Sequence, residues 1–70
     1  MDKVNEKNII RRLRVAMGLL EVRLSGLNYL KRDIPSKYSD HHWKAIYLLR
    51  DSIVALNTEI NLMEREIDDE

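Results

Sequence analysis

The chain has 70 residues with 12 basic and 12 acidic side chains, so it forms one small domain whose zero net charge argues against a strongly basic nucleic-acid binder. It has no Cys, which excludes disulfides, and no apolar stretch approaches the roughly 18 residues of a membrane span. Only two Gly and one Pro accompany 44% hydrophobic residues, a composition that favours a folded helical protein. The first residues lack the apolar core of a secretory signal, so we expect a soluble cytoplasmic protein that does not bind membranes.

The first predicted helix spans residues 3–33, with Asp2 as a competent N-cap. Its apolar residues recur at alternating intervals of three and four, the a/d spacing of a coiled-coil heptad repeat. This first seam consists of Ile10, Leu13, Met17, Leu20, Leu24 and Leu27, and Ile9, Ala16 and Leu30 widen it on one side. An alternative is an interruption at Ser25-Gly26, which would leave a short second segment.

The same helix carries a second apolar strip on its opposite face. At 100° per residue, Val15, Leu19, Val22 and Tyr29 lie roughly opposite the first seam, and we call them the outer strip. A helix with two apolar faces is usually buried on both. The outer strip is therefore a candidate partner surface.

The chain turns once, in a loop predicted at residues 34–39. Pro35 ends the first helix because it disfavours helical geometry at Ile34 and lacks a backbone donor. Ser36, Ser39 and Asp40 are competent N-caps for a second helix over residues 40–67, which is followed by a frayed acidic tail at 68–70.

The second helix carries the longer seam, formed by Ile46, Leu49, Ile53, Leu56, Ile60, Met63 and Ile67. Further apolar residues lie off this seam, with Trp43, Tyr47 and Val54 on one side and Leu48, Ala55 and Leu62 on the other. Two long helices and a short loop predict an all-α antiparallel hairpin as a single domain over residues 1–70. Because one hairpin cannot hide this much apolar surface, we expect two copies to form a four-helix bundle with both seams in its core.

Charge differs between the two halves of the chain. Residues 1–37 hold nine Lys and Arg against four Asp and Glu, a net charge of +5, whereas residues 38–70 hold three against eight, a net charge of −5. The basic face of the first helix consists of Lys7, Arg11, Arg12, Arg14 and Arg23. In an antiparallel hairpin these cations lie beside the acidic end of the second helix, so pairing with Glu59, Glu64 and Glu66 is favoured over binding of nucleic-acid phosphates.

His41 and His42 are adjacent, which is a poor arrangement for metal binding. Neighbouring positions on a helix diverge by about 100°, so the two imidazoles do not converge on one ion. His42 precedes Ile46 on the seam, where it is expected to close the end of the core or cap a neighbouring group. We therefore predict no metal site and no cofactor.

Three of the four aromatic residues, Tyr38, Trp43 and Tyr47, gather near the loop and the start of the second helix. Trp and Tyr are enriched in binding hot spots, which makes this end a second candidate partner surface. The alternative is that these side chains pack inside the dimer or onto the end of the first helix.

The sequence contains no nucleophile with a base at a recognisable spacing and no glycine-rich phosphate loop, so we do not expect an enzyme. The favoured hypothesis is a small regulator, inhibitor, adaptor or assembly factor that binds another protein as a hairpin oligomer. One alternative is a nucleic-acid-binding helical dimer that uses the basic face. Another is a subunit whose apolar strips are completed by a different protein.

Overall fold

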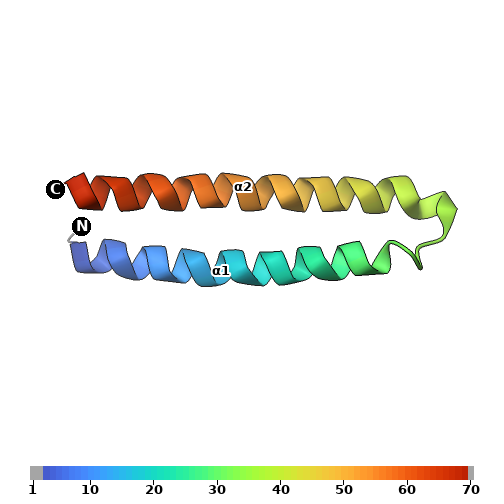
Figure 1. Cartoon of the computed structure of the whole chain (residues 1–70), viewed down its shortest axis with the longest axis horizontal. Coiled ribbons are helices and arrows are strands. Elements are labelled where there is room, and N and C mark those ends of the chain that lie inside the picture. The colour runs from blue at the N-terminus through green and yellow to red at the C-terminus, as the bar shows by residue number, and fades with distance from the viewer. Residues whose placement is uncertain (1–2, 70) are drawn as a thin grey trace.

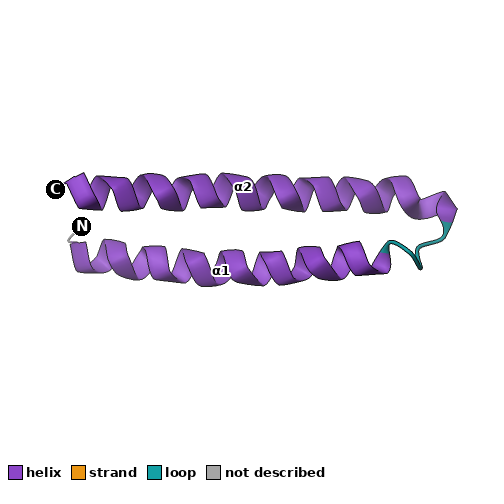
Figure 2. Ribbon diagram, viewed as in Figure 1, coloured by secondary structure: helices purple, strands orange, loops and turns teal. Residues whose placement is uncertain are grey.

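The computed structural model describes residues 3–69. They form two long antiparallel helices, α1 (Lys3–Leu30) and α2 (Ser39–Asp69), with one 3-10 turn, η1 (Ser36–Tyr38), in the connection (Figures 1 and 2). The described residues contain no strand, and the predicted all-α hairpin is confirmed. The cap predicted at Asp2 lies outside the described residues.

The first helix ends earlier than the sequence suggested. α1 stops at Leu30 instead of residue 33, because the N–H of Asp33 donates to the carbonyl of Leu30 at 2.9 Å and closes a turn there. A second turn follows, in which the N–H of Tyr38 donates to the carbonyl of Pro35, also at 2.9 Å. The hydroxyl of Ser39 then donates to the carbonyl of Ser36 at 2.9 Å, where α2 begins.

The alternative of an interrupted first helix is not confirmed, and the expected frayed tail needs correction. α1 runs without interruption through Ser25-Gly26, and neither glycine of the chain has a positive φ, so the backbone there is ordinary helix. α2 continues through Asp69, so residues 68 and 69 are helical and not a frayed tail, while Glu70 lies outside the described part. The buried side chain of Ile67 packs against Ile10 and Ile60, which holds the last turn of α2 on the hairpin.

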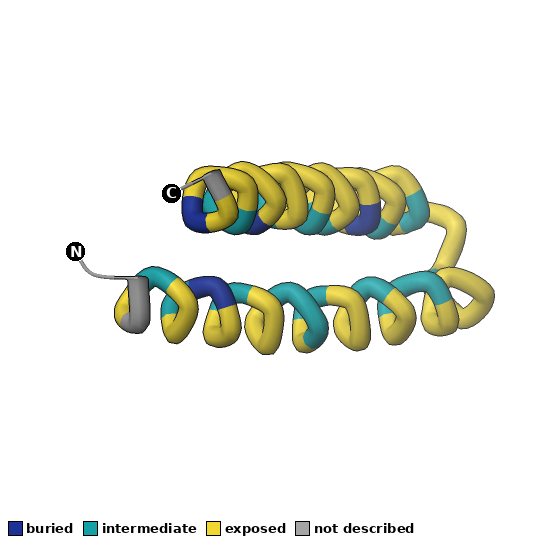
Figure 3. The backbone as a smooth tube through the Cα atoms, turned by 60° about the vertical axis from the view of Figure 1, so that its left-hand side comes forward, coloured by how far each residue is buried: buried dark blue, intermediate teal, exposed yellow. Residues whose placement is uncertain are grey.

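The two seams face each other along the whole hairpin. Every one of their thirteen residues is buried or half-buried within the single chain. The buried and half-buried positions lie mainly on the sides of the helices that face each other (Figure 3). The best-buried are Ile10, Ile46, Ile60 and Ile67, and two of these, Ile46 and Ile60, are 1% and 0% exposed. Three of the four belong to one cluster at the open end of the hairpin, where Leu13, Met17, Leu56 and Met63 pack around them.

The molecule is a rod, measuring 52 × 15 × 14 Å. Its radius of gyration is 16.1 Å, against about 11 Å for a compact domain of this length. Its accessible surface is 5781 Å², against about 4,600 Å² for a compact protein of 8.3 kDa. The hairpin therefore exposes roughly a quarter more surface than a compact fold of equal mass.

Gly18 offers a test of how α1 is surrounded in solution. It lies in the helix interior, and a Cβ atom added there meets nothing within 4 Å. Since Ala is a better helix former, Gly18→Ala should raise the free energy of unfolding by about 1 kcal/mol, measured by urea titration followed by circular dichroism. A loss of stability would instead mean that another helix approaches Gly18 closely.

Candidate functional site

The outer strip of α1 is uncovered in the hairpin. Val15, Leu19 and Val22 are 63–66% exposed, and Tyr29 is 79% exposed. These fractions are high for aliphatic and aromatic side chains, each of which gains about 1.5–3 kcal/mol on full burial. The strip is thus an apolar surface without a cover in the single chain.

The aromatic residues near the loop form a small stack. The rings of Trp43 and Tyr47 lie one turn apart on α2, with centroids 5.7 Å apart and planes inclined by 27°. The Lys31 ammonium sits 5.1 Å from the centre of the Trp43 ring, and all three residues are exposed. Tyr38 stands separately in η1, where the Lys37 ammonium lies 5.0 Å from its ring. The hairpin therefore brings two of the three predicted aromatic residues together and adds a cation from beyond the end of α1.

The basic face of α1 is only partly neutralised within the chain. Arg14 forms an ion pair with Glu64 across the two helices, as antiparallel pairing predicts. Both side chains remain 40–47% exposed, so the pair contributes about 0–1 kcal/mol. Arg11 and Arg12 are exposed and have no ion pair with the described residues.

A shallow groove of about 350 Å³ lies beside these two cations. Arg11, Arg12, Val15, Ala16 and Leu19 line it, so it joins the basic face to the outer strip. All five residues come from α1. One helix alone supplies this groove, and a partner would have to cover it from outside.

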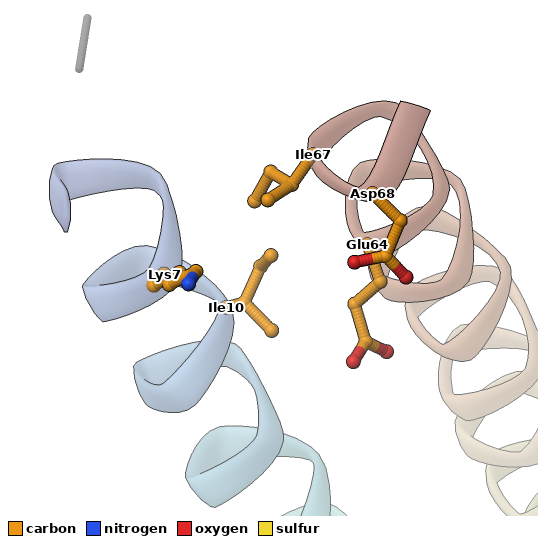
Figure 4. Close-up of a pocket in the computed structure, with 5 residues that line it drawn as sticks. All are labelled: Lys7, Ile10, Glu64, Ile67 and Asp68. Atoms are coloured by element: carbon orange, nitrogen blue, oxygen red, sulfur yellow. The ribbon is translucent and has the colours of Figure 1, made fainter. Parts of the chain in front are cut away.

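A second hollow, which was not predicted above, lies at the open end of the hairpin (Figure 4). It has a volume of about 230 Å³ and is lined by Lys7 and Ile10 from α1 and by Glu64, Ile67 and Asp68 from α2. The two isoleucines point toward each other, and the carboxylates project from the α2 side. The signal was present in the heptad pattern, because Lys7 and Glu64 flank the seam, but their convergence depends on how the helices are aligned.

His42 ties the two helices together near the loop. Its Nε2 lies 2.7 Å from the carbonyl oxygen of Leu27, so Nε2–H donates to this oxygen. Leu27 is one of the last four residues of α1, whose carbonyls have no partner inside the helix. His42 therefore caps α1, one of the roles expected from its position, whereas His41 is exposed.

Polar chemistry is sparse elsewhere in the described part of the chain. No polar or charged side chain there is buried, and no group of three His, Cys, Asp or Glu residues is placed to hold a metal ion. Neither described helix has a long enough apolar run to cross a membrane. Glu59 and Glu66 are exposed on α2.

The chain has no significant match among protein-family models, curated proteins or solved structures.

The cap made by His42 can be tested against its neighbour. His42→Ala removes the donor to Leu27 and should lower the free energy of unfolding by about 0.5–1.5 kcal/mol in urea titration. His41→Ala is the matched control, because this adjacent side chain is exposed, and it should change stability by less than about 0.5 kcal/mol. Equal effects of the two substitutions would contradict the cap.

Proposed function

We propose that this protein is a non-enzymatic protein–protein interaction module that works as a hairpin oligomer, with a dimeric four-helix bundle as the favoured form. The observation that carries the proposal is the imbalance in burial of apolar side chains. Eleven large hydrophobic residues are exposed in the described hairpin, while four are buried. Large exposed apolar surfaces mark sites of association.

Size supports self-association. A core in a chain of this length rarely supplies more than about 3–5 kcal/mol without a disulfide, a metal or a partner chain. The chain has no Cys, and its described residues form no metal-binding group. A second hairpin would cover apolar surface on both copies, and two-fold dimers are the commonest oligomers.

A bundle of two hairpins would still leave part of each helix outside. Val15, Val22 and Tyr29 lie on the side of α1 that faces away from the seam, and Trp43 and Tyr47 lie off the seam of α2. These side chains are the surface we propose for a protein target, since Trp and Tyr dominate binding hot spots. The target would therefore contact a rigid helical face of this protein instead of a loop.

Nucleic-acid binding is the second candidate, supported by Arg11 and Arg12. Both guanidinium groups are exposed, and Arg14 is the member of this run that pairs with a described acidic residue. Arg binds phosphate oxygens in bidentate fashion, so two neighbouring exposed Arg residues could contact a backbone.

Mass in solution tests the first proposal. Light scattering after size exclusion, over a concentration series, should give about twice the 8.3 kDa chain mass, with helicity that falls on dilution as the dimer dissociates. A stable, fully helical monomer at all concentrations would exclude self-association. A weakly helical monomer would instead favour the alternative in which a different protein completes the fold.

Salt dependence tests the second candidate. If the basic face binds phosphates, affinity for labelled RNA or DNA should fall steeply as salt rises, and Arg11→Gln with Arg12→Gln should reduce the slope by about two. Glu21→Gln, a change on the same helix that leaves both guanidinium groups in place, should bind no more weakly than the unmodified protein. The absence of any shift at low salt would remove this candidate.

A further inference from the structure

We infer that a second copy of this chain docks on one particular edge of the hairpin, with α1 of each copy lying on α2 of the other and both loops at the same end. This inference rests on the self-association proposed above and specifies its surface and orientation. The surface, called here the docking edge, contains the exposed apolar residues Ala16, Leu19 and Leu30 of α1 and Leu48, Ala55 and Leu62 of α2.

The contact between Arg14 and Glu64 shows which sides of the two helices lie together. These residues flank the seam on their helices, and their ion pair places both on the same edge of the hairpin. A residue two places further along a helix projects about 200° away, on the other side of the seam. Ala16 on α1 and Glu66 on α2 therefore lie on the opposite edge.

Heptad spacing extends each edge along the rod. Residues seven places apart share a line on a helix, so the edge marked by Arg14 also carries Glu21 and Asn28 on α1 and Arg50 and Asn57 on α2. This edge is largely polar between its ends.

The docking edge has a different composition. The line through Ala16 passes Arg23 and reaches Leu30 on α1, and the line through Glu66 on α2 contains Ala45, Ser52 and Glu59. Leu19 and Leu48 lie directly beside these lines, 63% and 59% exposed. Small side chains beside exposed leucines make a nearly flat apolar surface, which lets another helix approach within the usual 8–10 Å between axes.

Charge selects the occupant of this edge. On this edge, the α1 positions between Ile9 and Leu30 include Arg12 and Arg23 and no Asp or Glu. The α2 positions of the same edge, from Ala45 to Glu66, include Glu59 and Glu66 and no Lys or Arg. A surface that is basic along one half and acidic along the other is complementary to itself. A second copy therefore fits it, because a two-fold interface brings the same patch of both subunits together.

Charge also selects the orientation. A two-fold axis along the rod places α1 on α2 of the second copy, so Arg12 and Arg23 face a line that contains Glu59 and Glu66. A two-fold axis across the rod would place α1 on α1, with the Arg residues facing one another and the Glu residues likewise. Like charges in direct opposition are unfavourable, so the first arrangement is preferred.

The area of the edge suits a dimer. A face 52 Å long and 15 Å wide covers roughly 780 Å², close to the roughly 800 Å² that each partner buries in a standard stable interface. Docking there leaves the opposite edge outward, with the stacked rings of Trp43 and Tyr47 and the Arg14–Glu64 pair still accessible.

Matched charge insertions test which edge is used. Leu48 and Val54 are both exposed on α2, at 59% and 65%, but Val54 lies off the docking edge on the side of Tyr47. Leu48→Lys should raise the dimer dissociation constant by roughly a hundredfold, because it buries a cation in each subunit against the basic α1 side of the other copy. Val54→Lys should change it less than about threefold. Circular dichroism at high concentration checks that both variants remain helical.

Cross-linking tests the orientation and does not depend on a disruptive change. The chain has no Cys, so Leu19→Cys and Ala55→Cys each introduce a single thiol. Arg14 and Glu64 lie at the same height along the rod. Residue 19 follows Arg14 by five positions and residue 55 precedes Glu64 by nine on the antiparallel helix, so their heights along the rod differ by about one helical turn. In an equal mixture of the two variants, a short bifunctional maleimide should yield mainly the mixed product, joining position 19 of one chain to position 55 of the other.

The outcomes distinguish failure of the docking edge or its orientation from failure of the proposed self-association. A dimer whose dissociation constant responds equally to Leu48→Lys and Val54→Lys would overturn the docking edge, and dominant products joining position 19 to position 19 would overturn the orientation. Self-association would stand in both cases. An unmodified protein that is monomeric at every concentration would overturn the self-association itself, and the docking edge with it.

Discussion

Two helices that pack along a single seam can bury only one face of each other. In this hairpin the seams of α1 and α2 face each other from the open end, at Ile10 and Ile67, to the loop end, near Leu27. Four isoleucines of the described residues are buried there, and two of them, Ile46 and Ile60, are fully enclosed. The other seam residues remain half-buried because no third element covers their flanks. The rod shape, the excess surface and the exposed apolar strips all follow from this limit.

Two polar contacts depend on how α1 and α2 are aligned, whereas the apolar packing of the seams is not directional. Aliphatic seams of regular spacing tolerate sliding by a heptad, so they do not by themselves fix how far α1 is shifted along α2. His42 joins the loop end to a carbonyl that α1 leaves free, and Arg14 joins the flank of α1 to that of α2 further along. Neither contact is strong, but both form in this alignment of the two helices and would be lost if the seams slid by a heptad.

The sequence predicts the seams, the break at Pro35 and the hairpin well, because heptad spacing and proline geometry are local properties of the chain. The helix ends depend on contacts that are not local. α1 stops at Leu30 through a turn closed by Asp33, and α2 extends to Asp69 because Ile67 is buried against Ile10. The Trp43–Tyr47 stack could be anticipated from its spacing of four, whereas the approach of Lys31 depends on the path of the turn. The sequence also shows two sides of apolar residues on each helix, and the Arg14–Glu64 contact marks one of the two edges that antiparallel pairing of the seams creates.

The placement of the buried isoleucines has a consequence for how the hairpin opens and closes. Contacts near the loop, such as Leu27 with His42, join residues 15 positions apart, whereas Ile10 and Ile67 are 57 positions apart. Closing the longer span costs only about 1 kcal/mol more in chain entropy, but helices joined at one end would still be expected to separate first at the other. Here that free end holds the cluster of Ile10, Ile60 and Ile67. The covalent loop secures one end of the rod and the cluster secures the other, so we expect the two helices to separate cooperatively instead of unzipping from the free end.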